Sequence, residues 1–264
     1  MSFIARFVCL LVFPVSCNAA LAEIHASNAA GVAIGHVHLA VADVAACRKI
    51  WRDFGASEGA LGKQTLLGIP GIYILLRKSD AAGPSGGSAA DHLAFAVRDL
   101  AAYRQKLLAH AAKIVTDDDA AGVILGELPG GIRVEFRRNE AQEHEIEFHH
   151  VHLAAVEPDK LRAWYVAALG AEASARESML SALVPGGRVD FMMTDAAPAA
   201  TRGRAIDHIG FEVDDLEAFA ARLREQGITL DREPEFVPEL DLVVASLTDP
   251  AGTSIELTQG LRGK

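Results

Sequence analysis

Four histidines recur at equivalent places along this chain, and side chains of this type can hold a metal ion. They are His36, His92, His150 and His208, separated by intervals of 56, 58 and 58 residues. A lone histidine is more often a buried residue satisfied by hydrogen bonds. Here, however, seven of the ten histidines lie in the four stretches that surround these positions. The stretches read IGHVHLAVADV, ADHLAFAVRDL, HHVHLAAVEPD and IDHIGFEVDDL. A repeat of this regularity indicates four copies of one structural module.

Each copy predicts the same order of elements. An alternating strand carries the histidine, and an acidic residue seven positions later stands where a helix begins. Apolar spacing predicts helices over residues 44–54, 100–111, 159–169 and 216–226. Short β-type runs follow each helix, and turns of the Pro-Gly type separate the last two runs, as at Pro70-Gly71 and Pro185-Gly186. The module is therefore strand, helix and several strands, which predicts the α+β class.

Composition narrows the possible partners. The 264 residues are 50% hydrophobic, which is enough for one or two buried cores. The net charge is −10 and the sequence has no Lys/Arg cluster, so we expect no nucleic-acid partner. We also expect a monomer or homodimer.

The N-terminus has the pattern of a secretory signal. Arg6 precedes an apolar run over residues 7–15, and small residues end at Ala22. The run is too short to span a bilayer, so we predict a cleaved signal peptide over residues 1–22, an exported and periplasmic protein, and no transmembrane segment in the mature chain. Lipid anchoring at Cys17 is not expected, because Pro14 stands where such a site prefers leucine. Cys47 is then the only remaining cysteine, which excludes an internal disulfide.

The module resembles that of the vicinal oxygen chelate superfamily. The likeness rests on the first-strand histidine, the Pro-x-Gly turn and a closing apolar-Glu-apolar strand, and it covers residues 34–259. This superfamily includes glyoxalase I, extradiol dioxygenases, bleomycin and fosfomycin resistance proteins, and several epimerases and isomerases. The resemblance implies four βαβββ modules paired into two cupped or barrel-like mixed sheets. It also implies metal ligands on the first and last strands of each module.

The similar linkers over residues 79–89 and 194–203 indicate that a pair of modules was duplicated. After an N-terminal linker over residues 23–33, we therefore expect modules one and two to form one domain over residues 34–139. Modules three and four would form a second domain over residues 147–260. The alternative pairs module one with four and two with three, and it would join His92, Glu135, His150 and Asp190.

On the expected pairing, the resemblance implies one divalent metal ion (Fe, Ni, Mn, Co or Zn) in the second domain. Its ligands would be His150, His208, Glu256 and Asp190. Glu256 or Asp190 would also transfer protons, and His152 would be a proton carrier beside the metal. The first domain would offer a weaker set, because Leu75 occupies one of the four ligand positions. That set is His36, His92 and Glu135.

Three functions remain open. The first is a glyoxalase-like lyase or isomerase that acts on a small, vicinally oxygenated substrate. The second is an extradiol-type dioxygenase, disfavoured because Ser246 stands at the expected tyrosine and no histidine follows His208. The third is a metal-free protein that sequesters a small molecule, as the bleomycin resistance proteins do.

Overall fold

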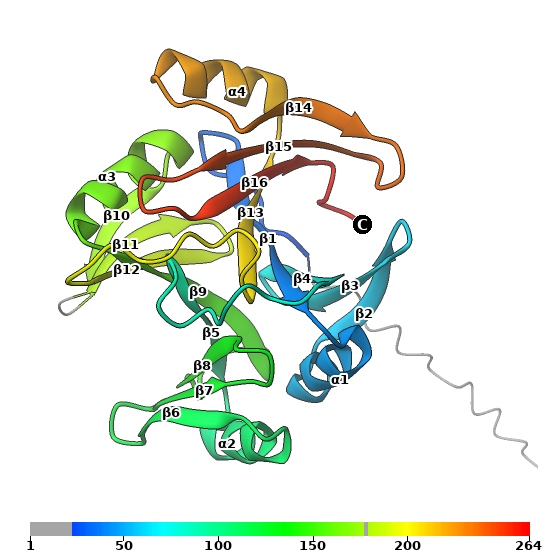
Figure 1. The fold of residues 1–264 in the computed structure, drawn as a ribbon, viewed down its shortest axis with the longest axis vertical. Helices are drawn as coiled ribbons and strands as arrows, with labels where there is room; N and C mark the ends of the chain where they lie inside the picture. Colours follow the sequence, from blue (N-terminus) through cyan, green and yellow to red (C-terminus); the bar gives the residue numbers. More distant parts are fainter. Residues whose placement is uncertain (1–22, 177–178) are drawn as a thin grey trace, which may run out of the picture.

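The computed structural model describes residues 23–176 and 179–264, so the predicted signal peptide lies outside the described residues. Two eight-stranded mixed sheets with four helices make up this part of the chain (Figure 1). The sheets are cupped rather than closed into barrels. The α+β class and the four βαβββ modules are confirmed.

The first sheet contains the strands of modules one and four, and we call it the 1/4 cup. From edge to edge its order is β14 (Arg232–Val237), β15 (Leu242–Thr248), β16 (Ser254–Gln259), β13 (Ile206–Val213), β1 (Val32–Val41), β4 (Ile72–Lys78), β3 (Gln64–Ile69) and β2 (Ser57–Leu61). The antiparallel pair β1 and β13 joins the two modules at the centre.

The second sheet contains the strands of modules two and three, and we call it the 2/3 cup. Its order is β10 (Glu172–Arg176), β11 (Met179–Val184), β12 (Gly187–Met193), β9 (Ile146–Ala155), β5 (Ala90–Val97), β8 (Arg133–Arg138), β7 (Val123–Glu127) and β6 (Lys113–Asp118). The predicted pairing of module one with two and three with four is therefore wrong. The alternative pairing is the one that forms.

The helices begin where the acidic residues of the repeat predict. They are α1 (Val44–Phe54), α2 (Leu100–Ala109), α3 (Pro158–Leu169) and α4 (Leu216–Glu225). Asp43, Asp99 and Asp215 each accept a hydrogen bond from a backbone N–H in the first helical turn. Glu157 makes no such bond, and α3 begins instead with Pro158, whose fixed φ suits the first helical position.

Equivalent residues of modules one and three make reciprocal contacts, which relate the two cups to each other. The Ile34 N–H donates to the carbonyl of Pro185, and the Phe148 N–H donates to the carbonyl of Pro70, at 2.9 and 2.8 Å. The linkers also run side by side, with a parallel bridge between Ser88 and Ala199. The duplication is therefore visible in the structure, although each cup takes one module from each duplicated half.

One large apolar core extends beneath both sheets, and it includes fully buried Trp51, Phe95, Phe136 and Phe211. Cys47 lies in this core, and burial raises the pKa of its thiol to about 12, so the thiol is unreactive. Among the described residues, no helix combines the length and apolar character needed to cross a bilayer.

Candidate metal centre

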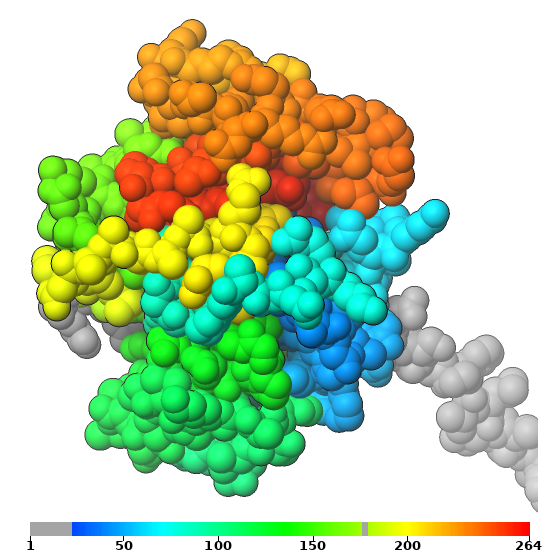
Figure 2. Space-filling view, in the orientation of Figure 1, coloured from blue at the N-terminus to red at the C-terminus, as the bar shows by residue number. Residues whose placement is uncertain are grey.

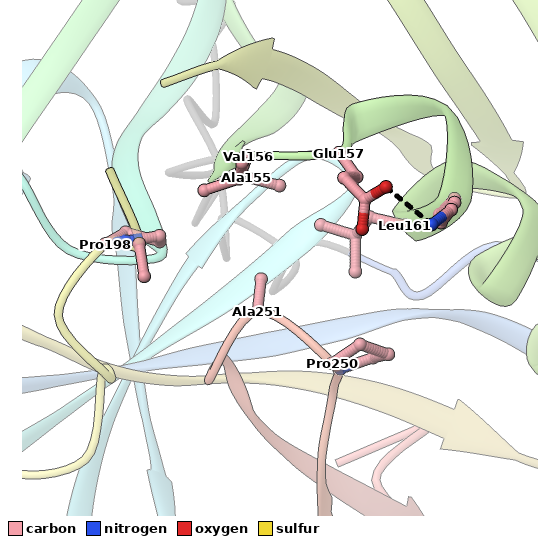
Figure 3. Close-up of a pocket in the computed structure, with 9 residues that line it drawn as sticks. Ala155, Val156, Glu157, Leu161, Pro198, Pro250 and Ala251 are labelled. Carbon is pink, nitrogen blue, oxygen red and sulfur yellow. Dashed lines mark ion pairs between the residues drawn. The ribbon is translucent and has the colours of Figure 1, made fainter. Parts of the chain in front are cut away.

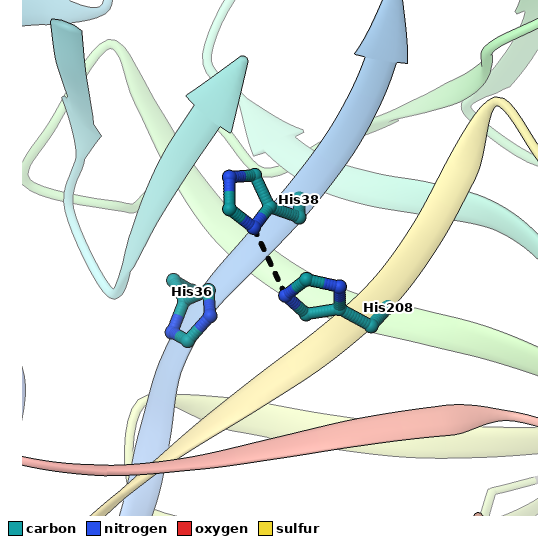
Figure 4. Close-up of side chains that lie close together, drawn as sticks. All are labelled: His36, His38 and His208. Carbon is teal, nitrogen blue, oxygen red and sulfur yellow. Dashed lines mark hydrogen bonds between the residues drawn. The ribbon is translucent and has the colours of Figure 1, made fainter. Parts of the chain in front are cut away.

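Three histidines meet on the concave side of the 1/4 cup, at the junction of its two modules. His36 and His38 lie on β1, and His208 lies opposite His38 on β13. His38 Nδ1 is 3.0 Å from His208 Nε2 (Figure 4). One ring nitrogen from each of the three side chains lies within 4.8 Å of the others. Alternation along β1 places residues 36 and 38 on one face, and strand pairing brings residue 208 to the same face.

Glu256 adds a carboxylate to this cluster from β16, which lies parallel to β13. Its Oε1 is 3.1 Å from His36 Nε2, and its Oε2 is 3.8 Å from His208 Nε2. Burial alone would raise the pKa of this carboxyl, but the contact with His36 and the nearby imidazoles lower it to about 2. Glu256 is therefore an anion across the physiological range, as a metal ligand must be.

A β-bulge supplies the partner that orients His208. The register between β1 and β13 pairs His38 with His208 and then Leu39 with Ile206, which leaves Asp207 as the extra residue. Asp207 accepts a hydrogen bond of 2.7 Å from the Nδ1–H of His208. This bond fixes the tautomer in which Nε2 of His208 carries the lone pair, which a metal could take in place of His38 Nδ1.

Asp207 is held in turn by two donors. Arg77 donates to its Oδ2 at 2.6 Å, and the backbone N–H of Gly203 donates to the same oxygen at 2.6 Å. Burial would raise the pKa of the Asp207 carboxyl, but the bonds from His208, Gly203 and Arg77 lower it to about 2. The carboxylate therefore remains charged beside the imidazole.

Gly210 makes room for His36. The two residues are partners across β1 and β13, and the imidazole lies directly over the glycine. A Cβ at position 210 would overlap the Cε1 and Nδ1 atoms of His36. This position therefore requires glycine because a side chain passes over it.

The donor set fits a divalent metal ion. Both ring nitrogens of the buried His36 lack a hydrogen-bond partner among the described residues, although Nε2 lies close to Glu256. Buried polar atoms usually have partners, and two imidazoles with one carboxylate form the facial triad that holds borderline divalent cations. His36, His208 and Glu256 make up this triad, and His38 stands beside it as a further nitrogen donor.

Two members of the triad, His36 and Glu256, line a cavity of about 230 Å³. His36, His38 and Glu256 line one side of the cavity. Its apolar wall includes Leu61, Leu75, Leu240, Leu242, Val244 and Leu261. The space is somewhat smaller than the roughly 300–1,000 Å³ of drug-sized ligand sites, so it suits a compact molecule.

The 2/3 cup contains an equivalent cluster. His150 and His152 of β9 and His92 of β5 form it, and their ring nitrogens also lie within 4.8 Å of one another. Asp91, the extra residue of a matching bulge, accepts a 2.9 Å bond from His92 Nδ1–H. Burial, followed by the proximity of His92, lowers the pKa of His152 to about 3.

Both carboxylates of the 2/3 cup are already engaged by arginines. Glu135 lies 3.6 Å from His92 but forms an ion pair of 3.0 Å with Arg137. Asp190 lies 3.6 Å from His150 but pairs with Arg188 at 3.0 Å. A metal ion here would have to displace these guanidinium groups. The positions equivalent to Arg137 and Arg188 in the 1/4 cup are Thr258 and Tyr73, which leave Glu256 free of a cation.

The structure divides the predicted ligand set between the two cups. His150 and Asp190 lie in the 2/3 cup, whereas His208 and Glu256 lie in the 1/4 cup. The grouping of these four residues, and that of His36 with His92 and Glu135, is therefore wrong because the modules pair differently. Likewise, His152 lies beside His92, away from Glu256.

A third hollow in the described surface lies apart from both clusters. It measures about 220 Å³ and lies between the start of α3, the linker near Pro198 and the turn at Pro250 (Figure 3). The one acidic side chain in its lining is Glu157, which pairs with Lys160 at 2.5 Å. Its lining contains no histidine, so it lacks the donor set of the cups.

Comparison with known proteins agrees with the geometry. Residues 147–257 match the model of the Glyoxalase/Bleomycin resistance protein/Dioxygenase superfamily. This matched segment, a little under half of the chain, belongs to that superfamily. The matched segment spans modules three and four. Module three forms half of the 2/3 cup, and module four forms half of the 1/4 cup.

Solved structures of this superfamily share the fold over most of the chain. Glyoxalase I from Zea mays is 15% identical, with a TM-score of 0.66 over 86% of this chain and 92% of that chain. A putative dioxygenase from Bacillus subtilis subsp. subtilis str. 168 is 14% identical, with a TM-score of 0.66 over 90% of this chain and 86% of that chain. No curated protein matches by sequence. At these identities the likeness establishes the fold, and the chemistry has to come from the site itself.

Sequence reasoning missed the residues that support the triad. Asp207 and Asp91 each directly precede the key histidine of an even-numbered module, and this Asp-His pair was a readable signal. His38 was a recognisable neighbour of His36. Arg77 gave no such signal, because only the folded sheet brings it to Asp207.

Proposed function

We propose that this chain is a divalent-metal-dependent enzyme of the vicinal oxygen chelate superfamily, a glyoxalase-like lyase or isomerase whose active site is in the 1/4 cup. The observation that carries the proposal is the triad of His36, His208 and Glu256, of which His36 and Glu256 line a largely apolar cavity. The ion would be Fe, Ni, Mn, Co or Zn, since these suit mixed imidazole and carboxylate donors. When bound, it would polarise two neighbouring oxygens of a small substrate and stabilise negative charge on them.

The residues around the triad would orient a ligand, exclude water and transfer a proton. Asp207 holds the ring of His208 in position, and the leucine and valine wall excludes water from the substrate. His38 lines the cavity beside the triad. Burial, followed by the proximity of His208 and His36, lowers the pKa of His38 to about 3, so its imidazole is neutral at physiological pH. We assign to His38 the transfer of a proton between adjacent substrate atoms, the role that the sequence suggested for His152.

Metal analysis of matched variants tests the proposal. The His208→Ala and His36→Ala proteins should lose the metal, because each removes one of three ligands. The His150→Ala protein should retain it, since His150 is the equivalent of His36 in the other cup. If His208→Ala holds metal as tightly as the parent, the triad is not the metal site and the sequestering function becomes the better proposal.

One observation favours a second function, an extradiol-type dioxygenase. Leu75 stands where a second carboxylate would complete a four-ligand set, so the cup retains the two-histidine, one-carboxylate arrangement of non-haem iron oxygenases. Oxygen consumption by the iron-loaded protein with catechol substrates would support this alternative. Turnover without oxygen uptake would support the lyase or isomerase.

A further inference from the structure

A second cavity adjoins the first one at His38. It measures about 380 Å³ and shares His38 and Gln64 with the apolar cavity. Three cationic side chains line it: Lys63 from the β2–β3 turn, and Arg77 and Lys78 from the end of β4. The site therefore has a largely apolar cavity, whose lining also includes Arg232, and a basic cavity, and the two meet at His38 and Gln64.

The basic character of this cavity is local and largely uncompensated. The chain as a whole carries a net charge of −10, yet no acidic residue lines this space. Within residues 23–176 and 179–264, neither Lys63 nor Lys78 takes part in an ion pair. Arg77 gives one nitrogen to Asp207 and keeps its other N–H donors.

In a cavity beside α1, by contrast, carboxylates pair with the cationic side chains. It also has three cations, Arg48, Lys49 and Arg52. There, Glu58 lies 3.5 and 3.6 Å from the two arginines, and Asp53 lies 2.5 Å from Lys49. These carboxylates already occupy the positions that an external anion would take.

We propose that the basic cavity binds an anionic group of the substrate, a carboxylate or a phosphoryl group. This inference rests on the proposed function and adds the substrate class: a compact apolar molecule with vicinal oxygens at the metal and an anionic group beyond His38. Lys63 and Lys78 are the specificity-determining residues, because their ammonium groups are free to pair with the anion. The 1/4 cup thus selects an amphipathic anion over a neutral molecule of the same shape.

Calorimetric titration with inorganic phosphate and with acetate tests the inference on the full protein, both metal-loaded and metal-free, at low ionic strength. The Lys63→Ala/Lys78→Ala variant should bind the preferred anion about tenfold more weakly, which corresponds to two partly exposed charge pairs of ~0.7 kcal/mol each. The control variant Arg48→Ala/Lys49→Ala should bind like the parent. Tighter binding of phosphate would assign a phosphoryl group to the substrate, and tighter binding of acetate a carboxylate.

The titration separates this inference from the proposed function. Equal affinity in the parent and the Lys63→Ala/Lys78→Ala protein would overturn the anion site, as would the absence of anion binding to the parent. Either result leaves the metal centre intact if the metal content is unchanged. Conversely, a parent protein that binds no metal ion would count against the proposed function. Titration of that metal-free protein with the anions would still test the basic cavity.

Discussion

Replacement of Asp207 by asparagine tests the support of the metal centre without removing a ligand. Asp207 is 6% exposed, and its carboxylate accepts bonds from His208, Arg77 and Gly203 at 2.7, 2.6 and 2.6 Å. All three partners are donors, whereas an asparagine amide presents one oxygen and one NH₂ group. At least one donor must therefore face the NH₂ group, and the negative charge that fixes the imidazole is lost.

Loss of such an outer carboxylate typically weakens metal binding by about 10–100-fold, or ~1.4–2.7 kcal/mol. We expect Asp207→Asn to fall in this range, because the group it removes is buried and accepts three hydrogen bonds. Competition titration of Zn²⁺ or Co²⁺ against a chromophoric chelator measures the affinity. The matched control is Asp91→Asn, which makes the equivalent change in the 2/3 cup and should leave the affinity of the 1/4 cup unchanged. An Asp207→Asn affinity within about threefold of the parent would refute the orienting role of the bulge.

Three further predictions concern the 1/4 cup. Gly210→Ala should displace the His36 ring and lower metal affinity by at least about tenfold in the same titration, with little loss of helix and sheet content by circular dichroism. Both Gly62 and Gly227 have positive φ, but only a Cβ at Gly62 overlaps a carbonyl oxygen of the β14–β15 turn. Gly62→Ala should therefore lower the free energy of urea unfolding by about 1–3 kcal/mol more than Gly227→Ala does, and equal losses would contradict this. In the metal-free protein, stability should fall as pH decreases from 6.5 toward 3, because the unfolded chain protonates His38 and the folded chain, with a pKa of about 3, does not. His38→Gln should reduce the slope of the free energy of unfolding against pH by at most about 1.4 kcal/mol per pH unit. If urea titrations give the same slope for the parent and the variant, the imidazole is not buried as described.

The elements of each module could be predicted because local chemistry defines them. Helix α1 runs over Val44–Phe54 as predicted, since Asp43 caps its start and Gly55 ends it in the left-handed conformation. The confirmed family resemblance rests on the same local features. Each of them lies within a few residues of the signal that predicts it.

The pairing of modules could not be predicted, because the repeat carries no information about partners. Modules one and three resemble each other whether module one joins two or four, so the similar linkers fit both arrangements. Only the register of β1 with β13 and of β5 with β9 decides which histidines meet. The bulge at Asp207 is a second example, since an extra residue exists only relative to the opposite strand.

The pairing of the first module with the last has a consequence for the order in which this protein can fold during its synthesis. The 2/3 cup uses consecutive modules, so all of its strands are present once β12 has been made. The 1/4 cup needs β13 to β16, and its contact between His38 and His208 closes a separation of 170 residues. Figure 2 shows the first module's cyan segment beside the last module's orange segment. Contacts this distant in sequence form late because chain entropy opposes them. A nascent or truncated chain that lacks its last module would therefore have one finished cup but no metal triad, and catalytic competence would arise only when the final strands join the first.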